Sequence, residues 1–351
     1  MAGRTETDGL NSGRQFPARL LFDAIGTIFR MFKAYAFFTL KLAVSAGLIW
    51  LLMERIEIGA VAERLTQLAP GAIAASFAIL IVQSVIASTR WRIVSHRVGV
   101  PLGFVTALRL FCVGLFFNQT LVSSIGGDAV RIWFVRQLAD GMAEAFRSVL
   151  IDRLVALAGL FLIVAASLPV LLDLVTTPTA RAGVLAVLGV GIGTLILLLL
   201  LDRLPVLSQR LRTKGVLDEF ARSCRRVLLD PRVAFSALGL SLAVHLLSAL
   251  TVFVVARGIG IEVSLGQMVV LVPPVILVAT LPISVAGWGV REGAMISALG
   301  FAGVAPADAL AVSVIFGLAL IVIALPGGAV WLISLRRRTR PAPPPTAMSR
   351  P

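Results

Sequence analysis

The chain contains few of the residues from which most catalytic and metal sites are built. Among its 351 residues it has two cysteines, two histidines and one tyrosine, and only 14% are charged. His96 and His245 stand alone in the sequence, and no Cys/His spacing typical of a metal site occurs. Cys112 lies in an apolar run and Cys224 in a basic segment, so we expect no disulfide. We therefore expect no metal and no other cofactor.

The sequence also lacks the motifs and polar stretches of an ATP-driven or soluble enzyme. No glycine-rich phosphate-binding loop of the P-loop type is present, which argues against direct use of ATP. The longest polar segment, residues 202–232, is too short for a folded catalytic domain. Residues 1–34 are polar and basic without an early apolar core, so a cleaved signal peptide is not expected.

Hydrophobic residues make up 58% of the chain, far more than in a soluble domain. Several apolar runs reach the roughly 20 residues that a helix needs to cross a bilayer. The composition therefore predicts an all-α polytopic membrane protein. The full spans are expected near residues 36–53, 72–88, 156–175, 184–201, 233–255 and 309–335.

The net charge of +14 is distributed as in a membrane protein rather than as in a nucleic-acid-binding one. Cytoplasmic loops carry an excess of Lys and Arg, so the basic segments orient the chain with both termini in the cytoplasm. Basic loops also attract the anionic headgroups of the inner leaflet, at about 1 kcal/mol per residue near the surface. We expect membrane lipids as partners and no nucleic acid. Most of the 32 Lys and Arg residues lie in segments 1–34, 89–103, 131–153, 202–232 and 336–351.

A twelve-residue pattern occurs twice, at residues 120–131 and 280–291. The two copies share Thr, Leu, Ser, Gly, Val and Arg at equivalent positions. A glycine-broken apolar segment in corresponding positions of two halves is a pointer to a transporter's binding site. Chance is the rival interpretation, because short Gly, Val and Leu matches are common in so apolar a chain.

The charge pattern predicts that each copy lies in a re-entrant hairpin. The first element starts and ends beside basic segments, so it enters from the cytoplasm with its tip near residues 118–128. The second, interrupted by Pro and Gly between residues 273 and 293, starts and ends outside. About six full spans plus two hairpins, eight membrane elements in all, then form an inverted repeat with halves near residues 35–178 and 182–338.

Two segments at the cytoplasmic boundary are expected to be interfacial. The Arg-Trp-Arg sequence at residues 90–92 is typical of an anchor at the membrane surface. Apolar residues between positions 216 and 227 recur at helical spacing, which predicts an amphipathic helix that lies on the inner leaflet.

Ionisable residues in a membrane cost about 2.5–3.5 kcal/mol each on insertion scales and are candidates for function. Two interpretations stay open: acid–base pairs that only hold helices together, or Arg131 and Arg291 binding an anionic group. A guanidinium matches phosphate oxygens bidentately, which favours the second interpretation. The pairs are Asp128/Arg131, Asp152/Arg153 and Arg291/Glu292. The predicted substrate-binding residues are Asn118, Ser124, Gly126, Gly127, Asp128, Arg131, Asp152, Arg153, Gly287, Gly289, Arg291 and Glu292.

The Gly-Gly-Asp-x-x-Arg sequence at residues 126–131, followed by Asp152-Arg153, resembles the signature of the lysylphosphatidylglycerol synthase transmembrane (flippase-like) family. Residues 281–292 are similar to that family's second motif, and the resemblance covers about residues 40–335. A proline that the family's pattern has near residue 123 is replaced here by Val122-Ser123. The resemblance implies a bacterial inner-membrane protein that handles phospholipids or polyprenyl-linked lipids.

Charge, composition and the resemblance together predict a division of the chain. Residues 1–34 form a basic cytoplasmic tail, 35–338 a flippase-like transmembrane domain, and 339–351 a disordered Pro-rich tail. Full-length synthases continue into a soluble aminoacyl-transferase domain, which this sequence lacks, so we expect no enzyme activity. The leading hypothesis is a lipid translocase with a lipid phosphate bound between the hairpin tips. The alternatives are a lipid-modifying transferase that uses Asp128 or Asp152 with a metal, and a non-catalytic partner of a lipid-modifying enzyme.

Overall fold

The computed structural model consists of α-helices in the part of the chain that it describes. That part comprises residues 58–120, 126–200, 216–281, 284–285 and 287–338, with residues 39, 43, 45–47, 50 and 54. Twelve helices and no strand occur in these residues. Five of the helices are long and apolar enough to cross a membrane. The predicted class, an all-α multi-pass membrane protein, is confirmed.

The five long helices correspond to five of the six predicted spans. The span predicted at residues 36–53 lies largely outside the described residues, as do the predicted tails. Three boundaries differ by more than five residues: one helix begins at Met142 rather than near residue 156, one begins at Pro178 rather than near residue 184, and one ends at Arg97 rather than near residue 88. The helix from Met142 is longer than expected because polar residues of its first half, such as Ser148 and Asp152, are buried in the protein. The long helices are α3 (Pro70–Arg97), α6 (Met142–Ala166) with its continuation α7 (Leu168–Leu174), α8 (Pro178–Leu200), α11 (Pro231–Gly258) and α14 (Pro306–Arg338).

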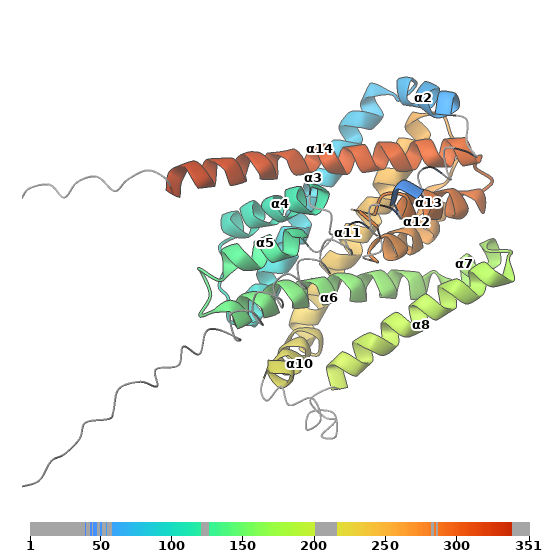
Figure 1. Cartoon of the computed structure of the whole chain (residues 1–351). Helices are drawn as coiled ribbons and strands as arrows, with labels where there is room; N and C mark the ends of the chain where they lie inside the picture. The colour runs from blue at the N-terminus through green and yellow to red at the C-terminus, as the bar shows by residue number, and fades with distance from the viewer. Residues whose placement is uncertain are drawn as a thin grey trace, which may run out of the picture.

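Four shorter helices form two pairs. Helices α4 (Phe104–Thr120) and α5 (Gly126–Val135) pack against each other, and so do α12 (Leu265–Ala279) and α13 (Val290–Gly300). Figure 1 shows the α4–α5 pair toward one end of the molecule and the α12–α13 pair toward the other, near α2 (Ile58–Thr66). The two predicted hairpin segments thus correspond to two helix pairs.

Helices α3 and α11 pack along their whole length in opposite directions. At one end the amide of Ala69 donates to the carbonyl of Gly258 at 3.0 Å, and at the other Arg97 pairs with Asp230. Gly258 permits the close approach, since a Cβ there would lie 2.4 Å from the Cβ of Ala72. This antiparallel pair joins the two halves of the chain.

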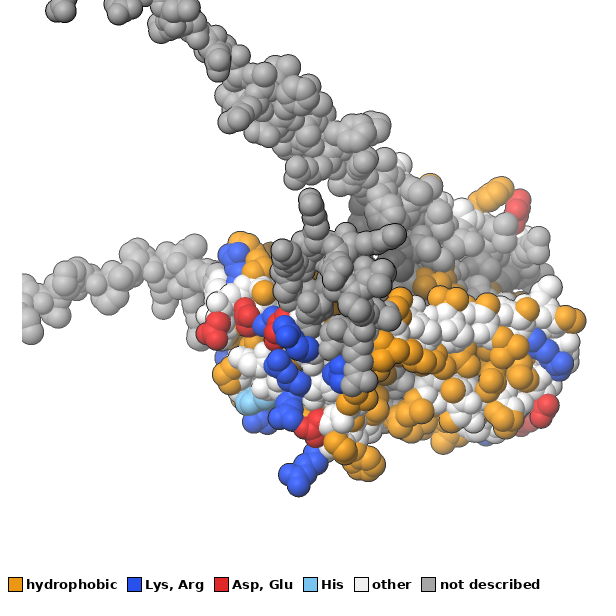
Figure 2. All heavy atoms as spheres, turned by 90° about the horizontal axis from the view of Figure 1, so that it is seen from below, with side chains coloured by type: hydrophobic (Ala, Val, Ile, Leu, Met, Phe, Trp, Pro, Cys, Tyr) orange, Lys and Arg blue, Asp and Glu red, His pale blue; other side chains and the backbone are white. Residues whose placement is uncertain are grey.

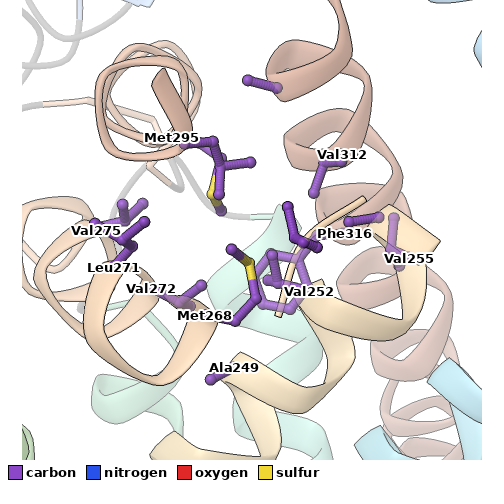
Figure 3. Close-up of a cluster of buried hydrophobic side chains, with 14 of the residues drawn as sticks. Ala249, Val252, Val255, Met268, Leu271, Val272, Val275, Met295, Val312 and Phe316 are labelled. Atoms are coloured by element: carbon purple, nitrogen blue, oxygen red, sulfur yellow. The ribbon is translucent and has the colours of Figure 1, made fainter. Parts of the chain in front are cut away.

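The second half has an apolar core between α11, α12, α13 and α14 (Figure 3). Met268 of α12 and Met295 of α13 point into it beside Phe316 of α14, and all three side chains are buried. Unbranched methionine side chains fill irregular gaps, which suits a core where short helices meet long ones.

Helix α10 (Val216–Leu228) corrects one prediction. Its apolar face does not lie on the leaflet: Phe220, Cys224 and Val227 are buried against other helices. Burial raises the pKa of the Cys224 thiol to about 12, because the thiolate would lose its hydration. The amphipathic pattern was correct, but the protein itself provides the apolar surface that the helix covers.

The lipid-facing surface is apolar along the flank and basic at one end (Figure 2). Helix α8 contributes strongly, with Leu185, Val190 and Ile196 exposed by 47%, 71% and 51%. Apolar exposure of this extent on a helix indicates contact with lipid rather than with water.

We predict that Gly327→Ala destabilises the protein by about 2 kcal/mol or more. A Cβ at Gly327 of α14 would lie 1.9 Å from the backbone oxygen of Cys112 on α4, so the helices must separate. Gly193→Ala on α8 is the matched control, since nothing lies within 4 Å of a Cβ there. Thermal unfolding in detergent micelles measures both; equal midpoints would mean that α4 and α14 do not cross at Gly327.

Candidate functional site

Five charged residues form an ionic cluster where α3, α5 and α6 meet, and four of them are buried. We call this set the first cluster: Arg90, Asp128, Arg131, Asp152 and Arg153. Arg131 donates from Nη1 to Asp128 Oδ1 at 3.2 Å and from Nη2 to Asp152 Oδ2 at 3.0 Å. Arg90 Nε contacts Asp152 Oδ1 at 2.9 Å, and Arg153 Nε contacts Asp128 Oδ2 at 2.6 Å. Each carboxylate therefore bridges two guanidinium groups.

Helix α3 supplies an aromatic support for this cluster. The Arg131 guanidinium carbon lies 3.9 Å from the centre of a Trp91 ring, and Trp91 is fully buried. The indole Nε1 donates to Ser148 Oγ at 3.1 Å, and Ser148 Oγ is 2.6 Å from Ser95 Oγ. The expectation that residues 90–92 form an interfacial anchor is wrong for Arg90 and Trp91, because the cluster provides both with polar partners inside the protein.

Helix α4 fixes the start of α5 by close backbone contact. A Cβ at Gly127 would lie 2.0 Å from the backbone oxygen of Gly114, and the Gly127 amide donates to Asn118 Oδ1 at 2.9 Å. Arg131 then lies along Gly114, where a Cβ would be 2.7 Å from its side chain. Asn118 and Gly127 thus position Arg131, and the adjacent Gly126 begins α5.

The first cluster carries one more positive than negative charge, since three arginines face two aspartates. Arg153 marks its accessible edge: 42% of its side chain is exposed, against 3% for Arg131 and 1% for Asp152. The Arg131 Nε–H is buried and has no hydrogen-bond partner in the structure. Asp152 lies ten residues into α6, about 15 Å along the helix, so the cluster lies among packed helices rather than at the end of α6.

A second cluster, defined as Gly289, Arg291, Glu292 and Ser313, lies at the start of α13. Arg291 contacts Glu292 Oε1 through Nη2 at 2.6 Å and Nε at 3.1 Å. The amide of Gly289 donates to Glu292 Oε2 at 2.6 Å, and Ser313 Oγ of α14 lies 3.3 Å from Oε1. Arg291 and Glu292 are 7% and 3% exposed, so the second cluster is a buried, neutral ion pair.

Two glycines shape the turn that leads into the second cluster. Gly287 and Gly289 have φ angles of 82° and 84°, a region that side chains with a Cβ rarely adopt. On the neighbouring α14, a Cβ at Gly317 would lie 2.1 Å from Arg291 Nη2, so Gly317 makes room for the guanidinium. The sequence motif therefore encodes a turn as well as a charge.

The structure contains two of the three predicted acid–base pairs and pairs the third aspartate with other arginines. The pairs Asp128/Arg131 and Arg291/Glu292 are present, whereas Asp152 pairs with Arg90 and Arg131 instead of Arg153. Ser124 lies outside the described residues.

The two clusters are distinct in the described part of the chain. No residue contacted by Arg131 is also contacted by Arg291. In the same part, no three His, Cys, Asp or Glu side chains gather as a metal ion would require.

Sequence reasoning missed Arg90 as a cluster member, although a signal was available. Ser76, Gln83 and Arg90 follow one another at intervals of seven residues, so they share one face of α3. A polar stripe on an apolar helix indicates a face that packs against protein, which excludes an interfacial position for Arg90.

We predict that Arg90→Gln destabilises the protein by about 3–5 kcal/mol, because it removes one of the two arginines that neutralise the buried Asp152. Arg222→Gln is the matched control: it breaks the exposed pair with Glu219 at 3.1 Å, worth about 0–1 kcal/mol. Unfolding midpoints in the same detergent provide the comparison. If Arg90→Gln is as stable as the control variant, the Arg90–Asp152 contact does not stabilise the cluster.

Comparison with known proteins identifies the family to which these features belong. Residues 38–327 match the family described as the lysylphosphatidylglycerol synthase TM region. No curated protein and no solved structure gave a match. The matched region contains both ionic clusters and both helix pairs. Since it covers most of the 351 residues, the chain belongs to the lysylphosphatidylglycerol synthase TM region family.

Proposed function

We propose that this protein is a lipid translocase of the bacterial inner membrane that handles a phospholipid or a polyprenyl-linked lipid. The family match supports a lipid-related function in a membrane. The observation that carries the proposal is the surplus positive charge of the first cluster. A net charge buried in a membrane costs free energy, and a lipid phosphate is an anion of the membrane that can neutralise it.

Arg131 and Arg153 are the groups that we expect to meet the phosphate in the first cluster. Arg153 lies at the exposed edge, where a headgroup arrives, and Arg131 has a spare buried donor at Nε. Guanidinium groups bind phosphate oxygens through parallel hydrogen bonds, and the low dielectric strengthens such contacts. Arg291 is the equivalent group of the second helix pair, so the phosphate would pass between the two hairpin tips.

We infer that the two helix pairs are re-entrant hairpins of opposite entry within an inverted repeat. Support comes from the sequence repeat, from the charge bias and from the location of the pairs toward opposite ends of the molecule (Figure 1). With the basic end of the molecule in the cytoplasm, both termini are cytoplasmic. The exposed arginines of α10, such as Arg222 and Arg226, then face anionic inner-leaflet headgroups.

We predict that Arg131→Lys and Arg291→Lys each lower lipid translocation by about tenfold or more, because lysine keeps the charge and loses the bidentate fork. The assay uses purified protein in liposomes with headgroup-labelled phospholipid, and counts lipid that reaches the opposite leaflet. Arg222→Lys, on the exposed face of α10, is the control. Normal transport by both Lys variants at normal abundance would contradict the assignment of the two arginines.

The same assay distinguishes translocation from other activities. Headgroup crossing without chemical change supports the proposal. A change in lipid mass would instead indicate a lipid-modifying transferase. Neither crossing nor modification would indicate a partner protein for a lipid-modifying enzyme, and would contradict the proposal.

We predict that cysteines at equivalent positions of the two copies are labelled from opposite sides. Thr120 and Thr280 are both exposed at the end of the first helix of their pair. A membrane-impermeant maleimide should reach Thr120→Cys only from the cytoplasmic side and Thr280→Cys only from the periplasmic side. Cys112 is replaced by alanine, whereas Cys224 can stay because its raised pKa of about 12 keeps it unreactive near neutral pH. Labelling of both positions from one side would contradict the inverted repeat.

A further inference from the structure

The two clusters differ in their charge balance, although the sequence repeat places an arginine at the same position of both. In the first, Arg90, Arg131 and Arg153 exceed Asp128 and Asp152 by one charge. In the second, one arginine faces one glutamate. An anion can add to the first cluster without displacing a carboxylate, whereas the second offers no surplus charge.

Glu292 occupies the positions that an incoming phosphate would take in the second cluster. Its Oε1 accepts both hydrogen bonds that Arg291 makes, at 2.6 and 3.1 Å. Its Oε2 accepts the Gly289 amide at the start of α13, the kind of helix terminus that binds anions. A carboxylate of the chain thus fills both parts of a ready-made anion site.

We propose that Glu292 is a resident counter-anion that competes with the lipid phosphate for Arg291, so that the second site is closed in the absence of lipid while the first is open. The inference rests on the proposed function, and it adds an order of occupation: the first cluster holds the phosphate before the second does. Two anions cannot share Arg291 and the Gly289 amide, because their charges repel at close range. Binding at the second site therefore requires that Glu292 release Arg291.

The geometry makes such a release local. Glu292 follows Arg291 directly in the chain, and the turn before it contains Gly287 and Gly289. The release that we propose is a change of the Glu292 side-chain rotamer, with α13 kept in place against α14. Ser313 remains as a hydroxyl partner near the same point.

The test measures phospholipid binding to the full chain in maltoside micelles, which contain no phosphate. Phosphatidylglycerol is titrated while the unfolding midpoint is recorded. We expect Glu292→Gln to unfold at a lower temperature than the wild type without lipid, since it leaves Arg291 without its carboxylate. We also expect it to bind phosphatidylglycerol about tenfold more tightly, because no carboxylate has to be displaced.

Three controls test whether the gain in affinity is specific to Glu292 and to a phospholipid. Glu144→Gln breaks a glutamate–arginine contact of the same 2.6 Å length outside the two clusters, and should leave the affinity unchanged. A galactolipid and inorganic phosphate replace phosphatidylglycerol in separate titrations. The galactolipid should stabilise none of the variants, and stabilisation by inorganic phosphate alone would assign the site to free phosphate rather than to a lipid.

Equal affinity of Glu292→Gln and wild type would overturn the inference, and so would tighter binding that persists in the Arg291→Gln/Glu292→Gln double variant. If Glu292→Gln does not fold, Glu292→Asp replaces it. The shorter carboxylate cannot reach both Arg291 and the Gly289 amide, so we expect a smaller gain in affinity. An unchanged affinity overturns the inference.

Wild-type protein that translocates lipid while Glu292→Gln binds no tighter would reject this inference and leave the proposed function intact. Absence of both translocation and lipid-dependent stabilisation would reject the two together.

Discussion

The placement of Asp152 between Arg90 and Arg131 is the interaction on which the first half of the structure depends. An aspartate with a 1% exposed side chain is tolerated only because two guanidinium groups neutralise it. Arg90 also donates to Ser241 of α11 at 3.2 Å, so the contact links α3, α6 and α11 with α5. Because leaving either side unpaired is costly, these four helices have one favourable arrangement.

Glycine provides the second constraint, since buried arginines need space close to the backbone. Gly114 and Gly127 bring α4 and α5 together along Arg131, and Gly317 leaves room for Arg291 beside α14. Small residues are favoured at helix contacts in membranes because they let backbones approach closely. Glycines on the neighbouring helices α4 and α14 thus create the space that the two arginines of the repeated motif occupy.

Charge balance distinguishes the two copies of the motif. Asp128 of the first copy bridges Arg131 and Arg153, and the position equivalent to Asp128 in the second copy is Trp288. The second copy instead carries Glu292 directly after its arginine. One repeated frame therefore carries a net positive cluster in one half and a neutral cluster in the other.

The sequence by itself determined the membrane class, five of the spans, the two broken elements and the ion pairs Asp128/Arg131 and Arg291/Glu292, because hydropathy, charge bias, glycine breaks and short acid–base spacings are local signals. Only the tertiary structure decided which partners those residues have. Asp152 faces Arg90 across 62 positions of chain rather than its neighbour Arg153, and α10 buries Cys224 against helices rather than in lipid. Pairing and burial depend on which helix faces meet, and helical periodicity leaves that choice open until long-range packing makes it.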